Sequence, residues 1–233
     1  MMNVLIIGAS GGIGTVLVDD LVDLSFNLLL GYRLNKPVVK STESQLVNAE
    51  NFEEVNNFVQ NGLDKFGKID AIINLAGNLI LKPAHLCNEE EFYDTINKNL
   101  KSSFAITRAA GSLLKDCSVV FLSTAATNIG LANHELISSA KSGVEGLVKS
   151  ASRTYARKNI RFNCVAPGLV DTPLSSKITS NPIALKASQK MHALGRIGKP
   201  SHISNMIKFL IKPENDWITG QNFVVDGGLS STK

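Results

Sequence analysis

The stretch that decides the fold reads Val4-Leu5-Ile6-Ile7-Gly8-Ala9-Ser10-Gly11-Gly12-Ile13-Gly14. An apolar run leads straight into a glycine-rich turn, and the residues after the turn place apolar side chains at helical spacing. Those side chains are Ile13, Val16, Leu17 and Leu21. A short apolar run followed by this period predicts a strand, a tight turn and a helix, in that order.

The glycines of the turn suit a ligand that carries phosphate. Gly8 lets the chain leave the strand sharply, because glycine enters positive φ freely. A bare Cα at Gly12 lets a diphosphate approach the backbone, and one at Gly14 lets the helix pack closely on the strand. The helix N-terminus adds unpaired N–H groups and the positive end of a dipole. We therefore expect Gly8, Ser10, Gly12, Ile13 and Gly14 to bind a cofactor. A structural turn without a ligand is the alternative.

Composition and charge are those of an ordinary globular chain. Of the 233 residues, 44% are hydrophobic and 19% are charged, which suits one α/β domain with a substantial core. The net charge of +4 comes without a Lys/Arg run, so an anionic small ligand fits better than nucleic acid. Cys87, Cys117 and Cys164 lack metal-ligand spacing and are expected to be reduced thiols. With no apolar run of transmembrane length and no recognisable leader, we expect a cytoplasmic protein without a metal or a membrane contact.

Strand-like and helix-like apolar patterns alternate along the chain. This alternation predicts an α/β fold with a doubly wound parallel sheet in a single domain, residues 1–233. The strands expected after the first are Phe26–Leu30, Gln45–Asn48, Ile69–Leu75, Val119–Leu122, Ile160–Val165 and Phe223–Asp226. The helices expected after the first are Glu53–Phe66, Glu89–Leu114, His134–Lys158 and Ser201–Leu210. Gly67 is expected to end the first of these, Ser201 to cap the last, and the polar segment 174–196 to form a mobile flap over a site.

The end of the second strand bears on the choice of cofactor. A dinucleotide site that prefers NAD(H) has an acidic residue about 20 residues beyond the glycines, where it accepts from the ribose 2′-hydroxyl. No acidic residue lies between Phe26 and Thr42, whereas Arg33 stands at the strand end with Lys36 and Lys40 behind it. A guanidinium suits a 2′-phosphate, so the sequence favours NADP(H), with NAD(H) as the second choice. A solvated arginine on a loop is the alternative.

The link from the second strand to the third is short. Pro37 and the β-branched pair Val38-Val39 disfavour a full helix there, although a parallel crossover usually contains one. We expect a turn or an extended link, which leaves one wall of an adenosine pocket thin. Asn48, at the end of the third strand, is expected to contact the cofactor.

Six short segments then complete a characteristic series. They are Gly8-x3-Gly12-Ile13-Gly14, Asn74-Leu75-Ala76-Gly77, Asn99-Leu100, Ala140-Lys141-Ser142-Gly143, Val165-Ala166-Pro167-Gly168 with Thr172, and Ile218-Thr219-Gly220-Gln221 through Val225-Asp226-Gly227-Gly228. In this order they resemble the short-chain dehydrogenase/reductase family, and most of all its 3-oxoacyl-carrier-protein reductases. The resemblance implies a seven-stranded Rossmann sheet, hydride transfer between a nicotinamide cofactor and a small-molecule substrate, and homodimers or homotetramers. It also implies a cofactor site that includes Asn74, Ala76, Gly77, Lys141, Pro167, Gly168 and Thr172.

The catalytic groups of that family are serine, tyrosine, lysine and asparagine, with the tyrosine four residues before the lysine. Lys141 matches the lysine, whose family role is to bind the nicotinamide ribose and lower the pKa of the tyrosine. Asn99 matches the asparagine, and Thr124 occupies the serine position with Ser123 beside it. Ile137 stands where the tyrosine is expected, so the central acid is absent.

Another residue would have to supply the proton. Tyr155 lies on the same helix as Lys141 but roughly 21 Å beyond it, and Tyr93 is expected on a different helix face. His134 is on the loop that enters the Lys141 helix, and an imidazole can donate a proton near neutral pH. An ordinary surface histidine is the alternative.

Two functions of different class follow. The first is a pyridine-nucleotide oxidoreductase with an altered proton donor, acting on a small carbonyl, quinone or imine. The second is a catalytically silent nucleotide-binding protein, a sensor or the partner subunit of an active relative. The second has support because the retained residues serve cofactor binding and the altered ones serve proton transfer.

Overall fold

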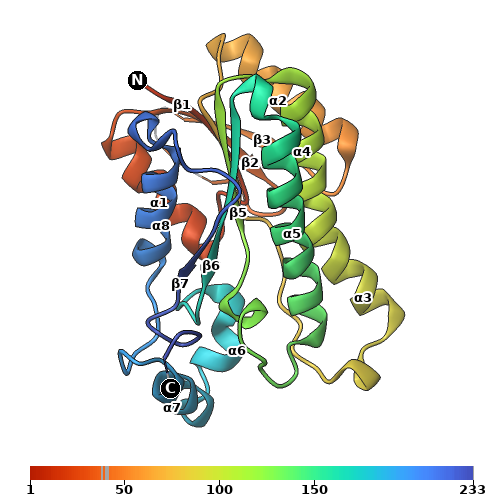
Figure 1. The fold of residues 1–233 in the computed structure, drawn as a ribbon, viewed down its shortest axis with the longest axis vertical. Helices are drawn as coiled ribbons and strands as arrows, with labels where there is room; N and C mark the ends of the chain where they lie inside the picture. The colour runs from red at the N-terminus through yellow and green to blue at the C-terminus, as the bar shows by residue number, and fades with distance from the viewer. Residues whose placement is uncertain (38, 40–41, 233) are drawn as a thin grey trace.

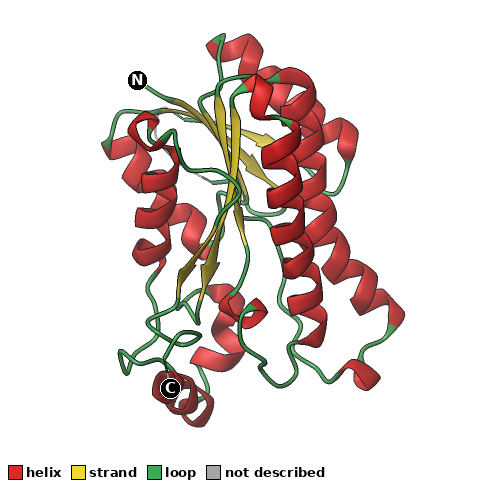
Figure 2. Cartoon of the chain, in the orientation of Figure 1, coloured by secondary structure: helices red, strands yellow, loops and turns green. Residues whose placement is uncertain are grey.

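The computed structural model describes residues 1–37, 39 and 42–232. Within them, parallel strands form one seven-stranded sheet in the order β3-β2-β1-β4-β5-β6-β7. The strands are β1 (Asn3–Ile7), β2 (Asn27–Tyr32), β3 (Glu43–Leu46), β4 (Ala71–Asn74), β5 (Cys117–Leu122), β6 (Ile160–Pro167) and β7 (Asn222–Val225). Helices cover both faces of the sheet (Figure 2). The predicted doubly wound parallel sheet is confirmed.

Two apolar cores lie on the two faces of the sheet. One face carries α1 and α8, and the other carries α2, α4 and α5 (Figure 1). These helices are α1 (Gly12–Asp23), α2 (Phe52–Phe66), α4 (Ser102–Leu113), α5 (Glu135–Thr154) and α8 (Pro200–Ile211). Successive side chains of a strand point to opposite faces, so Val4 and Ile6 pack with α1 and α8 whereas Leu5 and Ile7 pack under α2. Both faces of β1 are therefore buried, as its uninterrupted apolar run predicts.

Shorter helices connect these layers. They are η1 (Ala84–Leu86), α3 (Glu89–Ile96), η2 (Asn97–Lys101), η3 (Ala125–Thr127), η4 (Ala156–Lys158), η5 (Pro173–Ser175), α6 (Ser176–Thr179), α7 (Pro182–Met191) and η6 (Pro213–Asn215). η2 is a single π-helical turn between α3 and α4, so the helix expected over Glu89–Leu114 is continuous but locally wider, with hydrogen bonds that span five residues instead of four. π-turns of this kind are frequent at functional sites.

Several expected boundaries differ from the structure. The third strand is Glu43–Leu46, two residues earlier than expected, because its hydrogen-bond register is set by β2, with Leu46 opposite Tyr32. Lys199, and not Ser201, is the N-cap of α8, with Pro200 in its first turn. The segment 174–196 is largely helical, since it contains α6 and α7, and its mobility stays a prediction.

Two local predictions agree with the structure. Gly67 ends α2 with φ of 73° and donates its N–H to Leu63 O at 2.7 Å, as an αL cap does. The described residues between Arg33 and Thr42 contain no helix, as expected from Pro37. Val38, which also entered that expectation, and Lys40, which entered the expectation about the cofactor, lie outside the described residues.

The described ranges contain neither a candidate membrane span nor a candidate metal cluster. No helix there is long and apolar enough to cross a membrane. The same residues contain no cluster of three or more His, Cys, Asp or Glu side chains that could hold a metal ion. The three cysteines are free thiols, and Cys117 and Cys164 are buried.

Gly14→Ala is expected to destabilise the fold. An ideal Cβ at Gly14 would lie 2.5 Å from Gly8 O and 2.7 Å from Ala9 O, so the helix would have to move off the turn. Overpacking of this kind costs about 1–3 kcal/mol, which urea unfolding measures.

Gly146→Ala is the matched control, because it also adds a methyl group inside a helix. Nothing lies within 4 Å of an ideal Cβ at Gly146, so this variant is expected to gain about 0.5–1 kcal/mol of stability. Equal effects of the two substitutions would contradict the packing argument.

Candidate cofactor and active site

A cavity of about 620 Å³ lies at the carboxyl ends of β1, β2, β3 and β4. In open α/β sheets ligands bind outside the carboxyl ends of the strands, where the strand order reverses, and here that point is between β1 and β4. The volume falls in the range of small-molecule sites, roughly 300–1,000 Å³. The sequence-predicted residues that line the cavity are Gly8, Ser10, Gly12, Ile13, Gly14, Arg33, Asn48, Ala76, Gly77 and Thr172.

The glycine turn forms the centre of this cavity. Gly8 has φ of +81°, and an ideal Cβ on it would lie 2.7 Å from Ala76 N, so the turn and the loop after β4 are in direct backbone contact. Gly12 also has a packing role that the sequence analysis did not predict. A Cβ on Gly12 would lie 2.8 Å from Thr172 Cβ and 2.9 Å from Pro173 Cδ. α1 begins without a side-chain cap and without an acidic residue in its first turn. Its positive end is therefore available to an anion.

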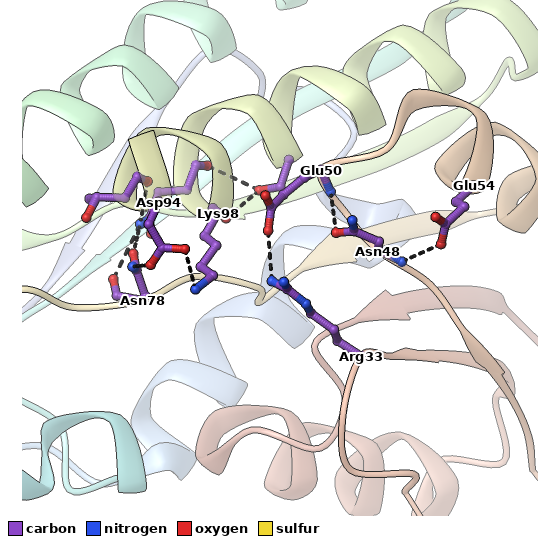
Figure 3. A network of polar contacts seen from close by, with 10 residues as sticks. Arg33, Asn48, Glu50, Glu54, Asn78, Asp94 and Lys98 are labelled. Carbon is purple, nitrogen blue, oxygen red and sulfur yellow. Dashed lines mark hydrogen bonds and ion pairs between the residues drawn. The ribbon is translucent and has the colours of Figure 1, made fainter. Parts of the chain in front are cut away.

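Arg33 is paired with a carboxylate at the rim of the cavity. Its Nη1 atom lies 2.8 Å from Glu50 Oε1, on the loop between β3 and α2 (Figure 3). Glu50 accepts this hydrogen bond although it lies 17 residues after Arg33 in the sequence. The spacing from the glycine motif that points to Arg33 does not point to Glu50. Asn48 shapes the same loop, because its Oδ1 accepts from Glu50 N at 3.2 Å. The predicted site residues Arg33 and Asn48 thus meet a third residue that sequence reasoning missed.

The loop after β4 is held from beneath by Asn74. Its buried Nδ2 lies 3.2 Å from Ser102 Oγ and 3.3 Å from Ser103 Oγ, and its Oδ1 accepts from Ala76 N at 3.1 Å. The sequence analysis expected Asn74 in the cofactor site, but Asn74 does not line the cavity. It positions Ala76 and Gly77, and these two residues line it.

A polar network joins this loop to the π-turn (Figure 3). Lys98 Nζ lies 2.5 Å from Asp94 Oδ1, and Asn78 Nδ2 donates to Asp94 Oδ2 at 2.7 Å. Asn99 Nδ2 in turn donates to Asn78 Oδ1 at 2.7 Å. Lys98 and Asn78 line the cavity and were not identified from the sequence. The only signal in the sequence was that each adjoins a motif residue, Lys98 before Asn99 and Asn78 after Gly77.

Lys141 and Asn99 converge on Gly77. An ideal Cβ on Gly77 would lie 2.6 Å from Asn99 Oδ1 and 3.8 Å from Lys141 Nζ, so only a bare Cα leaves room for both side chains. Lys141 Nζ donates to Leu122 O at 2.8 Å. Asn99 Oδ1 is buried and has no hydrogen-bond partner among the described residues. The structure thus brings together two predicted catalytic residues from different helices, and one buried polar atom of this pair has no partner among the described residues.

Burial lowers the pKa of Lys141 to about 8. The cause is desolvation, which disfavours the charged ammonium, and it outweighs a smaller opposing effect from Cys164. A perturbed pKa in a group beside a cavity is typical of functional sites.

The two hydroxyls at the end of β5 have different surroundings. Ser123 Oγ donates to Glu145 Oε1 at 2.5 Å, and the same oxygen accepts from Thr127 at 2.7 Å and from Asn222 at 2.8 Å. Ser123 is therefore occupied by a contact within the fold. Thr124 Oγ1 accepts from a backbone N–H two residues on, at 3.3 Å, and its own proton is still available to donate.

Comparisons with known proteins agree with this geometry. The family model described as Enoyl-(Acyl carrier protein) reductase matches residues 8–230. The 3-oxoacyl-[acyl-carrier-protein] reductase FabG of Thermotoga maritima is 30% identical, over 97% of this chain and 96% of its own length. The crystal structure of a short chain dehydrogenase family protein from Francisella tularensis matches with a TM-score of 0.89 at 25% identity, over 100% of both chains. The chain belongs to the short-chain dehydrogenase/reductase family. The structure titled ElxO with NADP bound has the same fold, with a TM-score of 0.90 at 24% identity over 99% of both chains.

In this short-chain dehydrogenase/reductase, the residue one helical turn before Lys141 is Ile137, which has no acidic proton. Ile137 is 3% exposed and has no titratable group. The three tyrosines have other surroundings. Tyr155 packs on Phe162 with ring centroids 5.8 Å apart, Tyr93 is exposed on α3, and Tyr32 lines the cavity near Arg33.

His134 is the N-cap residue of α5 and is partly buried. Its Nδ1 lies 2.8 Å from Ala132 O, a contact within its own loop. Neither feature tests whether it donates a proton to a substrate, so that role stays a prediction.

The segment after β6 contributes less to the cofactor cavity than the resemblance implied. Pro167 ends β6, and Gly168 lines a second cavity of about 290 Å³ instead. A Cβ on Gly168 would lie 2.8 Å from His192 Nε2 and 3.0 Å from Asp226 Cα, so this glycine is explained by packing. Of the three residues expected here, Thr172 lines the larger cavity.

The buried Lys141 is expected to reduce stability at neutral pH. Its pKa is about 8 in the folded protein against 10.5 for a lysine in water, so the unfolded chain binds more protons between these pH values. Stability from this group therefore rises with pH through that window. Relative to Lys141→Met, the native protein is expected to gain about 2 kcal/mol between pH 7 and pH 9.5.

Urea unfolding of both proteins at the two pH values measures this change. Taking the difference cancels the opposite effect of the buried thiols of Cys117 and Cys164, whose pKa values burial raises to about 12. A pH-independent difference would show that Lys141 is not desolvated.

Proposed function

We propose that the protein is an NAD(P)(H)-dependent oxidoreductase that transfers hydride to or from a small carbonyl, quinone or imine substrate. Its active site is altered, with Ile137 at the tyrosine position and Thr124 at the serine position. The observation that carries the proposal is the convergence of Lys141 and Asn99 on Gly77, a residue of the cavity wall. A lysine buried without a hydrogen-bonded carboxylate costs stability, so its presence favours a role with a ligand.

The residues of the cavity fit a nicotinamide dinucleotide. The N-terminus of α1 and the bare Cα atoms of the glycine turn suit the diphosphate. Arg33 follows β2 and lines the cavity where we expect the adenosine ribose. Lys141 does not itself line the cavity, but its Nζ donates to the backbone oxygen of Leu122, which does. The buried Asn99 Oδ1, which lacks a partner in the described residues, can accept a hydrogen bond from a ligand or water. When bound, the nicotinamide supplies the hydride chemistry, and the protein supplies position and charge.

The roles of the protein residues follow from their chemistry. Thr124 can donate its hydroxyl proton to a substrate oxygen, and the Lys141 ammonium can stabilise negative charge near the cofactor ribose. Ile137 can do neither. Loss of a general acid costs about 10²–10⁴-fold in rate, or roughly 3–5 kcal/mol of barrier. Quinones and imines need less acid help than simple ketones, so they are the favoured acceptors.

A second candidate is a catalytically silent nucleotide-binding protein that acts as a sensor or as the partner subunit of an active relative. The buried Ile137 supports it, because the residue at the expected tyrosine position packs in the core while the predicted cofactor residues of the glycine turn still line a cavity. Turnover separates the two. Oxidation of NADPH or NADH against a panel of carbonyls, quinones and imines supports the enzyme, and tight binding without turnover supports the sensor.

The assembly and location belong to the same proposal. Family resemblance favours a homodimer or homotetramer in the cytoplasm, acting on a small molecule without nucleic acid or membrane. The half-exposed rings of Phe104 on α4 and Phe52 on α2, with centroids 6.0 Å apart, are consistent with a helix face that another copy covers.

The native protein is expected to bind NADPH more tightly than NADH, and Arg33→Gln is expected to weaken NADPH binding about tenfold. Only NADPH carries a 2′-phosphate, and a hydrogen bond between charged groups is worth about 1.5–3 kcal/mol, at the lower end for a half-exposed arginine. Isothermal titration calorimetry with both nucleotides measures it. Arg157→Gln, at an exposed arginine outside the cavity, is the control. Tighter NADH binding by the native protein would contradict the prediction, and so would an unchanged NADPH preference in the variant.

Ile137→Tyr is expected to create measurable ketone reduction with NADPH. The substitution places a phenol one helical turn before Lys141 on the same face of α5, where the ammonium lowers the phenol pKa. Steady-state assays with simple ketones compare the variant with the native protein. Ile137→Phe adds a ring of nearly the same size without the hydroxyl and is expected to stay inactive. Ordinary ketone reduction by the native protein would overturn this account of the site.

His134→Ala tests the replacement donor on the native background. Lost turnover with the best substrate of the panel, and an altered pH profile near neutrality, would make His134 the acid. Unchanged turnover would leave it a loop residue.

A further inference from the structure

The cavity contains a carboxylate that comes from outside the segment in which an acidic residue of an NAD(H) site is expected. Between Phe26 and Thr42 there is no acidic residue, and that absence favoured NADP(H). In the fold, Glu50 lines the cavity and pairs with Arg33, with 2.8 Å between Oε1 and Nη1 (Figure 3). Among the described residues that line the cavity, Glu50 is the one acidic side chain.

We propose that Glu50 sets the choice between NAD(H) and NADP(H). It acts as the acceptor for the adenosine ribose 2′-hydroxyl of NAD(H) and competes with the 2′-phosphate of NADP(H) for Arg33. This inference rests on the proposed function, since it assigns a selectivity residue to the same dinucleotide site.

The position of Glu50 is well defined by the backbone. β3 runs parallel to β2, with Leu46 opposite Tyr32, and Val47 N extends this pairing by donating to Tyr32 O at 2.8 Å. The loop that follows β3 is therefore beside Arg33, the residue that follows Tyr32. Glu50 N donates to Asn48 Oδ1 at 3.2 Å, which holds the loop in a turn just before α2 begins.

The carboxylate is the more enclosed partner of the ion pair. The side chain of Glu50 is 19% exposed and that of Arg33 is 52% exposed. Glu50 Oε1 accepts from Arg33, whereas Oε2 makes no hydrogen bond within the described residues. A ribose hydroxyl can therefore donate to Glu50 while the ion pair stays intact. This is the role that an acidic residue at the end of the second strand has in NAD(H)-preferring sites.

The charges at the cavity oppose a 2′-phosphate more than the sequence suggested. Arg33 and Lys98 are the basic residues that line the cavity among those described, and each is already paired, Arg33 with Glu50 and Lys98 with Asp94. A 2′-phosphate at Arg33 has to displace or face the Glu50 carboxylate, and two negative charges in contact repel. Glu50 therefore limits the preference for NADP(H) that Arg33 creates.

Glu50→Gln is the decisive variant, because it keeps the shape and the acceptor atom but removes the charge. Dissociation constants for NADPH and NADH are measured by calorimetry on the native protein and the variant. The half-molecules 2′,5′-ADP and 5′-AMP are measured in parallel, because they report on the adenosine site alone. The variant is expected to bind NADPH and 2′,5′-ADP more tightly and NADH more weakly. The ratio of the NADH to the NADPH dissociation constant is expected to rise at least tenfold.

Glu53→Gln is the matched control. It removes the same charge three residues away, from an exposed carboxylate in the first turn of α2 that does not line the cavity. It is expected to leave the ratio within twofold of the native value. Circular dichroism and thermal melting confirm that both variants fold.

The outcomes separate this inference from the proposed function. If the native protein binds neither nucleotide, the proposed function fails and the inference falls with it. If both nucleotides bind and Glu50→Gln leaves the ratio unchanged, or weakens NADPH, the inference alone is overturned. Glu50 would then be a structural partner that holds Arg33 in place.

Discussion

The direct contact between the glycine turn and the loop after β4 is the constraint on which the rest of the site depends. Gly8 at positive φ brings its Cα against Ala76 N, and Gly14 brings α1 against Gly8 O. These two contacts are made by backbone atoms and leave no space for a methyl group. Because the loop that touches Gly8 continues to Gly77, the glycine turn and the cavity wall near Lys141 belong to one continuous set of backbone contacts.

Several polar side chains near Gly77 and the end of β5 are buried in the core. Lys141 is buried with a backbone carbonyl as its partner, and Asn99 comes from a π-turn between two helices. Ser123 is drawn to Glu145, a carboxylate that also binds β7, and this leaves Thr124 as the hydroxyl with a free proton. An apolar core would be more stable than this arrangement. Departures from local stability of this kind are expected at functional sites.

At the Arg33 rim the cavity carries one charge of each sign instead. Under the proposed function Arg33 favours a phosphate and Glu50 opposes one, so selectivity there is a difference between two electrostatic effects. Lys98 also lines the cavity and is paired with Asp94. Asp94 accepts from Asn78, which in turn accepts from Asn99, so the cavity rim at Lys98 is joined by hydrogen bonds to the buried Asn99.

The sequence alone determined the sheet, the glycine turn and the presence of an isoleucine, Ile137, four residues before Lys141, because each is a local pattern. Strand and helix periods, and residues one helical turn apart on one helix, follow from covalent adjacency. Only the tertiary structure decided the partner of Arg33, because Glu50 reaches it through the pairing of β2 with β3. The same holds for the contact of Ser123 with Glu145. Such contacts depend on strand register and side-chain direction between distant segments, and the order of residues along the chain carries no periodic signal for either.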